Sequence, residues 1–103
     1  MEIYLKHRNR KQFVCILKKG NNTIELDVFH SSYLGDFDIS LSNYDESINE
    51  RHSWFSAQTE NTSINGKWQS VKAWQQSTKE EFMEAYASAK NSLHTFQLSI
   101  NPK

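Results

Sequence analysis

Residues 77–96 restrict the fold most strongly, because they have the pattern of one amphipathic helix with a marked beginning. Ser77-Thr78-Lys79-Glu80 matches the capping box, in which the Ser hydroxyl and the Glu carboxylate each accept a hydrogen bond from a free backbone N–H. Apolar residues then recur at intervals of four and three, at Phe82, Tyr86, Ala89, Leu93 and Phe96. A helix with a single apolar stripe buries one face, so the preceding residues must supply the surface that it covers.

Residues 2–41 supply that surface as four predicted strands. Apolar and polar residues alternate in residues 2–6, 24–28 and 36–41, which is the pattern of strands with one buried face. Residues 12–19 are apolar on both faces and are therefore predicted to lie in the centre of the sheet. The short connections between consecutive strands predict an antiparallel meander.

Residues 54–74 allow two interpretations. Asn65-Gly66 is a strong signal for a two-residue hairpin turn. A hairpin around this turn pairs Ser63 with Trp68 and, if it continues, Ala57 with Trp74. The alternative is a loose loop, because the stretch just before the turn is polar.

These elements predict one α+β domain over residues 1–103. We expect a mostly antiparallel meander sheet of five to six strands, followed by one C-terminal amphipathic helix packed on it, with a short flexible tail at residues 101–103. The length suits a single hydrophobic core. The three glycines fall at predicted turns and the only proline is Pro102, so no linker divides the chain.

Cys15 is the only cysteine, so neither an internal disulfide nor a Cys-based zinc cluster can form within one chain. It lies in the apolar residues 13–17, where a buried and inert thiol is expected. No stretch approaches the ~20 apolar residues of a membrane span, and the N-terminus lacks the apolar stretch of a signal peptide. A reducing, cytoplasmic location is therefore expected.

The net charge of zero conceals two opposed blocks. Residues 1–20 carry six Lys or Arg and one Glu, whereas residues 21–60 carry eight Asp or Glu and one Arg. A neutral total disfavours a dedicated nucleic-acid-binding protein, although a local basic patch can still act. The two blocks could instead pair head to tail between copies of the chain, which favours self-association.

The first predicted hairpin turn holds a cluster of cations that suits phosphate groups on nucleic acid or lipid headgroups. The candidate phosphate-binding residues are Lys6, Arg8, Arg10 and Lys11. Exposed turns are also rich in Lys and Arg because these residues keep strand edges soluble. The same four residues could therefore form a simple solvated turn.

The order of short antiparallel strands and a capped C-terminal helix resembles the pleckstrin-homology architecture. In that family a basic first hairpin can bind inositol phosphates, and Arg8-Asn9-Arg10 would occupy that place. The sequence departs from the family at two points. Lys6 lies closer to the arginines than the family's spacing, and Trp74 precedes the helix, whereas the family's tryptophan lies within it. The resemblance concerns architecture, which carries no function by itself.

Three tryptophans exceed what a core of this size needs. The hairpin register predicts that Trp68 and Trp74 pack in the core and that Trp54 lies on the opposite face, close to Arg51. An exposed Trp beside an Arg is typical of a protein-binding hot spot, and it could also stack on bases. The alternative is that a strand or loop covers Trp54. Arg51 and Trp54 are therefore the candidate protein-binding residues.

Catalytic and metal-binding motifs are absent from the sequence. The acidic set Asp36, Asp38, Asp45 and Glu46 includes an Asp-x-Asp pair, but Leu41 stands where a calcium loop needs glycine. The four histidines lie in separate elements without the spacing of metal ligands, and no nucleophile elbow accompanies the serines. No cofactor or metal is predicted.

The sequence thus predicts a non-enzymatic protein-interaction domain that binds another protein or a second copy of itself. A phosphate-binding module that uses the basic turn is the alternative. An enzyme would need a cleft lined by titratable groups with shifted pKa values.

Overall fold

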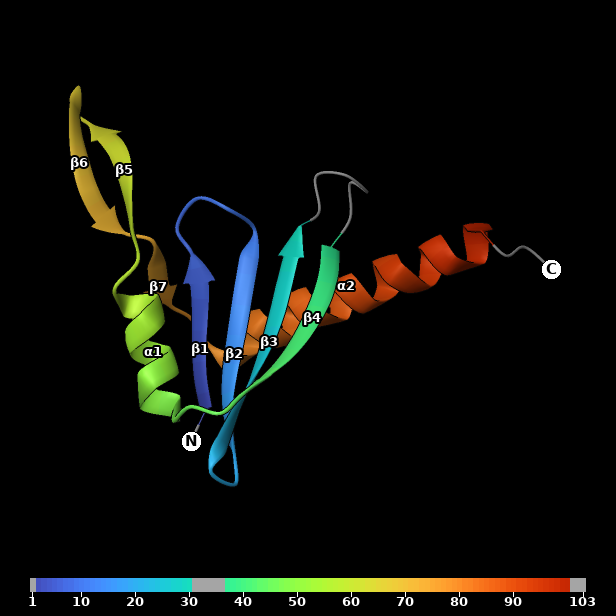
Figure 1. The fold of residues 1–103 in the computed structure, drawn as a ribbon. Helices are drawn as coiled ribbons and strands as arrows, with labels where there is room; N and C mark the ends of the chain where they lie inside the picture. Colours follow the sequence, from blue (N-terminus) through green and yellow to red (C-terminus); the bar gives the residue numbers. More distant parts are fainter. Residues whose placement is uncertain (1, 31–36, 101–103) are drawn as a thin grey trace.

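A computed structural model of the chain describes the backbone of residues 2–30 and 37–100, and the side chains of residues 2–29 and 38–91. Its main sheet has five antiparallel strands in the order β4-β3-β2-β1-β7 (Figure 1). The strands of this sheet are β1 (Glu2–His7), β2 (Gln12–Lys19), β3 (Asn22–His30), β4 (Phe37–Tyr44) and β7 (Trp74–Gln76). A second, two-stranded sheet and two helices are β5 (Thr59–Ile64), β6 (Lys67–Lys72), α1 (Ile48–Ser56) and α2 (Lys79–Ile100).

The predicted α+β class is confirmed, and so is the meander of the first four strands. β2 lies in the middle of the main sheet, as its two apolar faces predict. Val14 and Ile16 point to one face and are completely buried, whereas Cys15 is buried on the other. The predicted turn near Gly35 and the tail at residues 101–103 lie outside the described residues.

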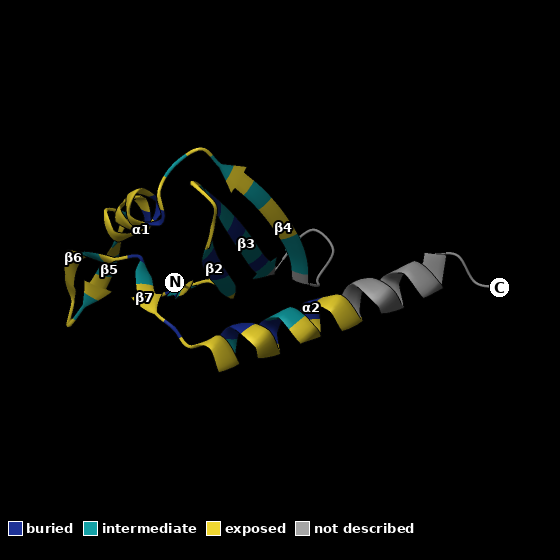
Figure 2. Ribbon diagram, turned by 90° about the horizontal axis from the view of Figure 1, so that it is seen from below, coloured by how far each residue is buried: buried dark blue, intermediate teal, exposed yellow. Residues whose placement is uncertain are grey.

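α2 covers one face of the sheet, as its apolar stripe predicts (Figure 2). Its buried side chains are Phe82, Ala85 and Ala89, which pack with Cys15 and Val28. Leu93 and Phe96 belong to the predicted stripe, but their side chains lie outside the described residues.

The cap of α2 lies one residue later than predicted. The Thr78 hydroxyl accepts a hydrogen bond from the N–H of Glu81 at 3.1 Å, so Thr78 caps the helix. Ser77 is held in the sheet instead, because its N–H donates to the carbonyl of Tyr4 at 2.8 Å. The Glu81 carboxylate turns to Lys6 rather than back to the cap.

The sequence interpretation missed a second helix, α1, which covers the opposite face of the sheet (Figure 2). The Ser47 hydroxyl accepts a hydrogen bond from the N–H of Glu50 at 3.2 Å and caps this helix. Ser47-Ile48-Asn49-Glu50 is itself a capping-box sequence, so the signal was present in the chain. Ile48 and Phe55 of α1 pack on Leu5, Val14 and Ile16 of the sheet.

The Asn65-Gly66 hairpin forms, and the loop alternative is wrong. Asn65 and Gly66 have φ values of 53° and 78°, the left-handed geometry of a tight hairpin turn, and Ser63 pairs with Trp68 as predicted. The pairing stops at Thr59 and Lys72, so the predicted pairing of Ala57 with Trp74 does not occur. Residues 54–56 lie in α1, which removes the strand on which that extended register depended.

Candidate functional site

The β5–β6 hairpin projects from the body of the protein (Figure 1). We call residues 59–72, which comprise both strands and their turn, the arm. None of its residues is buried. A two-stranded ribbon of this kind is marginal on its own, so its position depends on contacts at its base.

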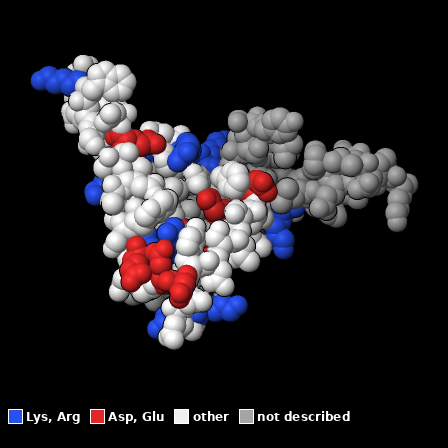
Figure 3. All heavy atoms as spheres, in the orientation of Figure 1, with Lys and Arg blue, Asp and Glu red and all other residues white. Residues whose placement is uncertain are grey.

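The two faces of the arm differ in exposure. One face carries the half-buried residues of the arm, which are Glu60, Thr62, Ile64 and Val71. Every residue on the other face is exposed, namely Thr59, Asn61, Ser63, Trp68, Ser70 and Lys72. Trp68 has 77% of its surface exposed and is surrounded by small hydroxyl and amide side chains. The arm is largely uncharged, with basic atoms at its outer end and acidic atoms near the body (Figure 3).

His7 anchors the arm to the first hairpin of the main sheet. Its Nε2 donates to the Glu60 carboxylate at 3.0 Å, and the amide of Asn9 donates to the other oxygen of Glu60 at 2.6 Å. The Nδ1 atom of His7 accepts hydrogen bonds from the backbone N–H groups of Asn9 and Arg10, each at 3.1 Å. This pattern requires a neutral imidazole with its proton on Nε2.

The protein favours that neutral form. Burial, and then the charge of Arg10, lower the pKa of His7 from its ordinary value of 6.5, and they outweigh the opposite effect of Glu60. The imidazole also meets the edge of the Trp74 ring, with 5.1 Å between the ring centroids. His7 is therefore a structural clamp between the arm, the basic turn and the core.

A second set of contacts fixes the other end of the arm's base. The Ala73 N–H donates to the Gln58 carbonyl at 3.1 Å, and the Trp74 indole N–H donates to the Gln58 side chain at 2.8 Å. The Lys72 ammonium donates to the carbonyl of Ser56 at the end of α1, at 2.6 Å. Together with the His7 contacts, these bonds hold the projecting arm in one orientation.

The two predicted protein-binding residues have different surroundings. Trp54 is 53% exposed on α1, so it can contact a partner. Arg51 is buried and forms an ion pair with Glu25 of β3. Its guanidinium lies 3.8 Å from the centroid of the Tyr44 ring and 4.7 Å from that of the Trp54 ring. Burial acts against the charged form, but the hydrogen bond and charge of Glu25 outweigh it and raise the pKa of Arg51. Arg51 therefore holds α1 on the sheet and supports the Trp54 ring from beneath.

Three of the four candidate phosphate-binding residues lie together on the first hairpin turn. Arg8, Arg10 and Lys11 are exposed on the turn between β1 and β2. Lys6 points to the α2 side of the sheet, where its ammonium lies 3.1 Å from the Glu81 carboxylate. The structure thus separates Lys6 from the other three residues.

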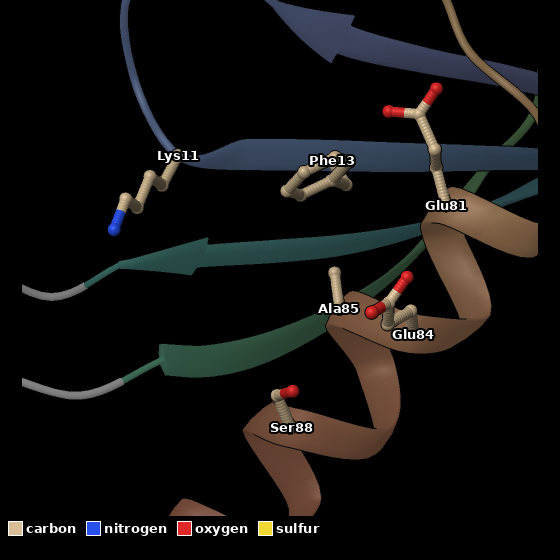
Figure 4. A pocket seen from close by; sticks show the side chains of 6 residues that line it. All are labelled: Lys11, Phe13, Glu81, Glu84, Ala85 and Ser88. Carbon is tan, nitrogen blue, oxygen red and sulfur yellow. The ribbon is translucent and has the colours of Figure 1, made fainter.

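Two grooves lie beside the helices. One of about 310 Å³ runs between the start of β2 and α2, with Phe13 and Ala85 between Lys11 at one end and Glu81 near the other (Figure 4). The other, of about 340 Å³, lies between β1, β7 and α1 and includes Phe55 and Trp74. The mixed charges of the first groove and the mixed polar and apolar lining of the second do not identify a reaction.

Trp68 is the surface residue that the sequence interpretation missed, because the hairpin register alone placed it with Trp74 in the core. A signal was available: its cross-strand partner is Ser63, and its neighbour on the same side of β6 is Ser70. A core tryptophan in a hairpin normally faces apolar partners, so this polar setting indicates a surface position.

Comparison with protein-family models, curated proteins and solved structures finds no match for this chain. No family model or solved structure supports the likeness to the pleckstrin-homology layout, and α1, between β4 and β5, interrupts the expected order of strands followed by one helix. Within residues 2–30 and 37–100, no helix is both long enough and apolar enough to cross a bilayer. Across the same residues, no three His, Cys, Asp or Glu side chains gather as metal ligands would.

Proposed function

We propose that this chain is a non-enzymatic protein-interaction domain and that the exposed face of the arm is its principal contact surface. The observation that carries the proposal is Trp68, a 77% exposed tryptophan on a projecting arm whose base is held by hydrogen bonds from two directions. Tryptophan is enriched among residues that dominate binding energy. A ring surrounded by Ser, Thr and Asn has the composition of adaptable binding surfaces.

The contacts that anchor the arm support a binding role for it. Association costs free energy when loops and side chains must be ordered at the interface, and a surface held beforehand avoids part of that cost. The contacts of His7, Asn9 and Gln58 order the base of the arm in the free protein. Trp54 is a second exposed aromatic residue that a partner could reach.

The buried polar groups support the non-enzymatic part of the proposal. His7 and Arg51 are buried and Asp27 is half-buried, and each is engaged in structural bonds, Asp27 with the amide of Gln12 at 2.9 Å. The proposal places the domain in the cytoplasm, where the buried free thiol of Cys15 would remain reduced.

Photo-crosslinking from position 68 tests the proposal. A photoreactive residue at position 68 should give an adduct of defined mass in an extract of the source cells, and a photoreactive residue at Met83, exposed on α2, should not. Competition with unlabelled protein should remove the adduct, whereas competition with Trp68→Ser protein should not. Identical adducts from both positions, or equal competition by Trp68→Ser, would contradict the proposal.

A phosphate-binding role for the basic turn is the second candidate. Its support is that Arg8, Arg10 and Lys11 are exposed on a turn whose backbone is fixed by His7 and by the bond from the Arg8 N–H to the Ala73 carbonyl at 2.8 Å. Binding of pyrophosphate, or of vesicles that contain phosphatidylserine, should weaken as salt rises. The double variant Arg8→Ala/Arg10→Ala should abolish it, and Lys6→Ala should not. Unchanged binding in the double variant would contradict a phosphate-binding role and would show that these cations only keep the turn solvated.

A further inference from the structure

β4 forms one edge of the main sheet and has little of the protection that natural edge strands carry. It has eight residues, Phe37–Tyr44, and contains no Lys, Arg, Pro or Gly. Edge strands that must stay free are usually short, interrupted by proline or bulges, or lined with lysine. The other edge of the sheet, β7, has only three residues.

The direction of the β4 backbone groups follows from the hairpin between β2 and β3. Lys19 and Asn22 flank a two-residue turn and so form a hydrogen-bonded pair, after which bonded and non-bonded pairs alternate along the ladder. The odd-numbered residues of β3 must then bond to β4, which they meet at Asp38, Ser40, Ser42 and Tyr44. The N–H and C=O groups of Ile39, Leu41 and Asn43 consequently point away from the sheet.

Only one of these outward N–H groups has a partner among the described residues. The Asp38 carboxylate accepts the N–H of Ile39 at 2.8 Å. The outward backbone groups of Leu41 and Asn43 have no hydrogen-bond partner within the described part of the chain. Leu41 also has 67% of its surface exposed, so an exposed apolar side chain lies beside these outward backbone groups.

α2 is longer than the sheet is wide. Its 22 residues span about 33 Å at ~1.5 Å per residue, whereas five strands span about 19 Å at ~4.8 Å per spacing. It crosses β4 on the side of Ile39, which packs against its buried residues, and continues past the edge (Figure 1). A strand added to β4 would therefore lie beneath the projecting part of α2.

A second copy of β4 fits this edge in an antiparallel, symmetric register. With the two-fold axis at Leu41, Leu41 faces Leu41 of the second copy, and Ile39 faces Asn43. Asp38, the only charged residue of the strand, faces Tyr44, so no like charges meet across the seam. A two-fold axis perpendicular to the sheet keeps both α2 helices on the same face of the joined sheet. Each α2 crosses the seam closer to Ile39 of its own copy than to Leu41. The two Leu41 side chains then lie between the paths of the two helices.

We propose that two copies of this chain associate through β4 to form a continuous ten-stranded sheet centred on Leu41. The inference uses a surface separate from the arm and does not depend on the function proposed for Trp68. It differs from the head-to-tail pairing of the two charge blocks, and two of the charges in those blocks are already paired within the chain, Lys6 with Glu81 and Glu25 with Arg51.

Sedimentation equilibrium over a wide concentration range tests the dimer. The wild-type chain should reach twice its monomer mass. Leu41→Lys should raise the dissociation constant at least about tenfold, because two ammonium groups then face each other at the two-fold axis. Leu41→Pro should have the same effect, since it removes an outward N–H that the monomer does not use. Met83→Lys, a matched change at a 48% exposed site on α2, should leave the dimer intact.

Two further measurements separate this dimer from other outcomes. Amide hydrogen exchange at Leu41 and Asn43 should slow as concentration rises, while exchange in the arm should not change. A strictly monomeric wild-type chain would overturn the inference, and so would a dimer that survives both Leu41 variants. A dimer lost in Trp68→Ser but kept in Leu41→Lys would also overturn it and would assign self-association to the arm.

Discussion

The imidazole of His7 and the carboxylate of Glu60 meet at 3.0 Å where the main sheet touches the base of the arm. The same imidazole accepts two backbone N–H groups of the basic turn. One side chain, only 1% exposed, therefore couples the two surfaces for which functions are proposed. Its protonation state decides whether both sets of bonds can exist together.

Acidification should loosen this junction. The pKa of His7 is lowered in the folded protein, so the unfolded chain binds more protons in the pH range just below 6.5. The free energy of unfolding should therefore fall as the pH drops through 6.5 toward the folded pKa of His7, because protonated Nδ1 can no longer accept the two N–H groups. Urea unfolding across this range measures the effect.

Two variants assign that pH dependence to His7. His7→Gln should flatten the dependence, while His52→Gln, at an exposed position of α1, should leave it as in the wild type. An equal pH dependence in wild type and His7→Gln would show that other groups are responsible.

The ion pair of Arg51 and Glu25 should be costly to break from one side. Both side chains are 8% exposed, so Arg51→Met leaves a buried carboxylate without its partner and should lower the free energy of unfolding by about 3–5 kcal/mol. The double variant Arg51→Met/Glu25→Leu should recover much of this loss. Glu46→Gln, at 42% exposure, should cost less than about 1 kcal/mol. Chemical denaturation of the three variants gives the comparison, and equal losses would argue against a coupled pair.

Neighbouring hydroxyls at the start of α2 should behave differently. Thr78→Ala removes the helix cap and should cost about 1 kcal/mol. Ser77→Ala removes a buried hydroxyl that has no hydrogen-bond partner among the described residues, and it should be neutral within about 0.5 kcal/mol, or stabilising. Thermal unfolding followed by circular dichroism distinguishes them. If Ser77→Ala lost more stability than Thr78→Ala, Ser77 would be the helix cap, as the sequence predicted.

The tryptophans should divide into a structural residue and a surface residue. Trp74 packs edge-on against Phe55, with 4.9 Å between ring centroids, and donates to Gln58, so Trp74→Ala should cost about 3 kcal/mol. Trp68→Ser should change the free energy of unfolding by less than about 0.5 kcal/mol, because its ring is exposed. A large destabilisation by Trp68→Ser would mean that the ring serves folding rather than binding.

Local signals account for most of the elements that sequence reasoning predicted. The alternation in β1, β3 and β4, the two apolar faces of β2 and the turn at Asn65-Gly66 each depend on neighbouring residues, and each appears as expected. α1 shows the limit of this reasoning. Its apolar residues Ile48 and Phe55 are few, and the extended hairpin register assigned residues 54–57 to a strand, so the capping signal at Ser47 was missed.

The candidate site was less predictable than the fold. Arg51 and Trp54 are neighbours in the chain, yet Arg51 is buried and paired with Glu25, which lies 26 residues earlier. Trp68 and Trp74 share an apolar character, yet one projects on the arm and the other packs beneath α1. Exposure depends on which distant element covers a residue, and residue type does not reveal that.

The sequence by itself determined the α+β class, the central place of β2, the apolar face of α2 and the register of the arm's turn. These properties depend on side-chain periodicity and local backbone geometry, which act over a few residues. Only the tertiary structure decided that His7 clamps Glu60, that α1 covers the second face, that Trp68 stands in solvent and that β4 ends the sheet with free backbone groups. These depend on contacts between residues far apart in the chain, which arise only when the sheet and helices pack together.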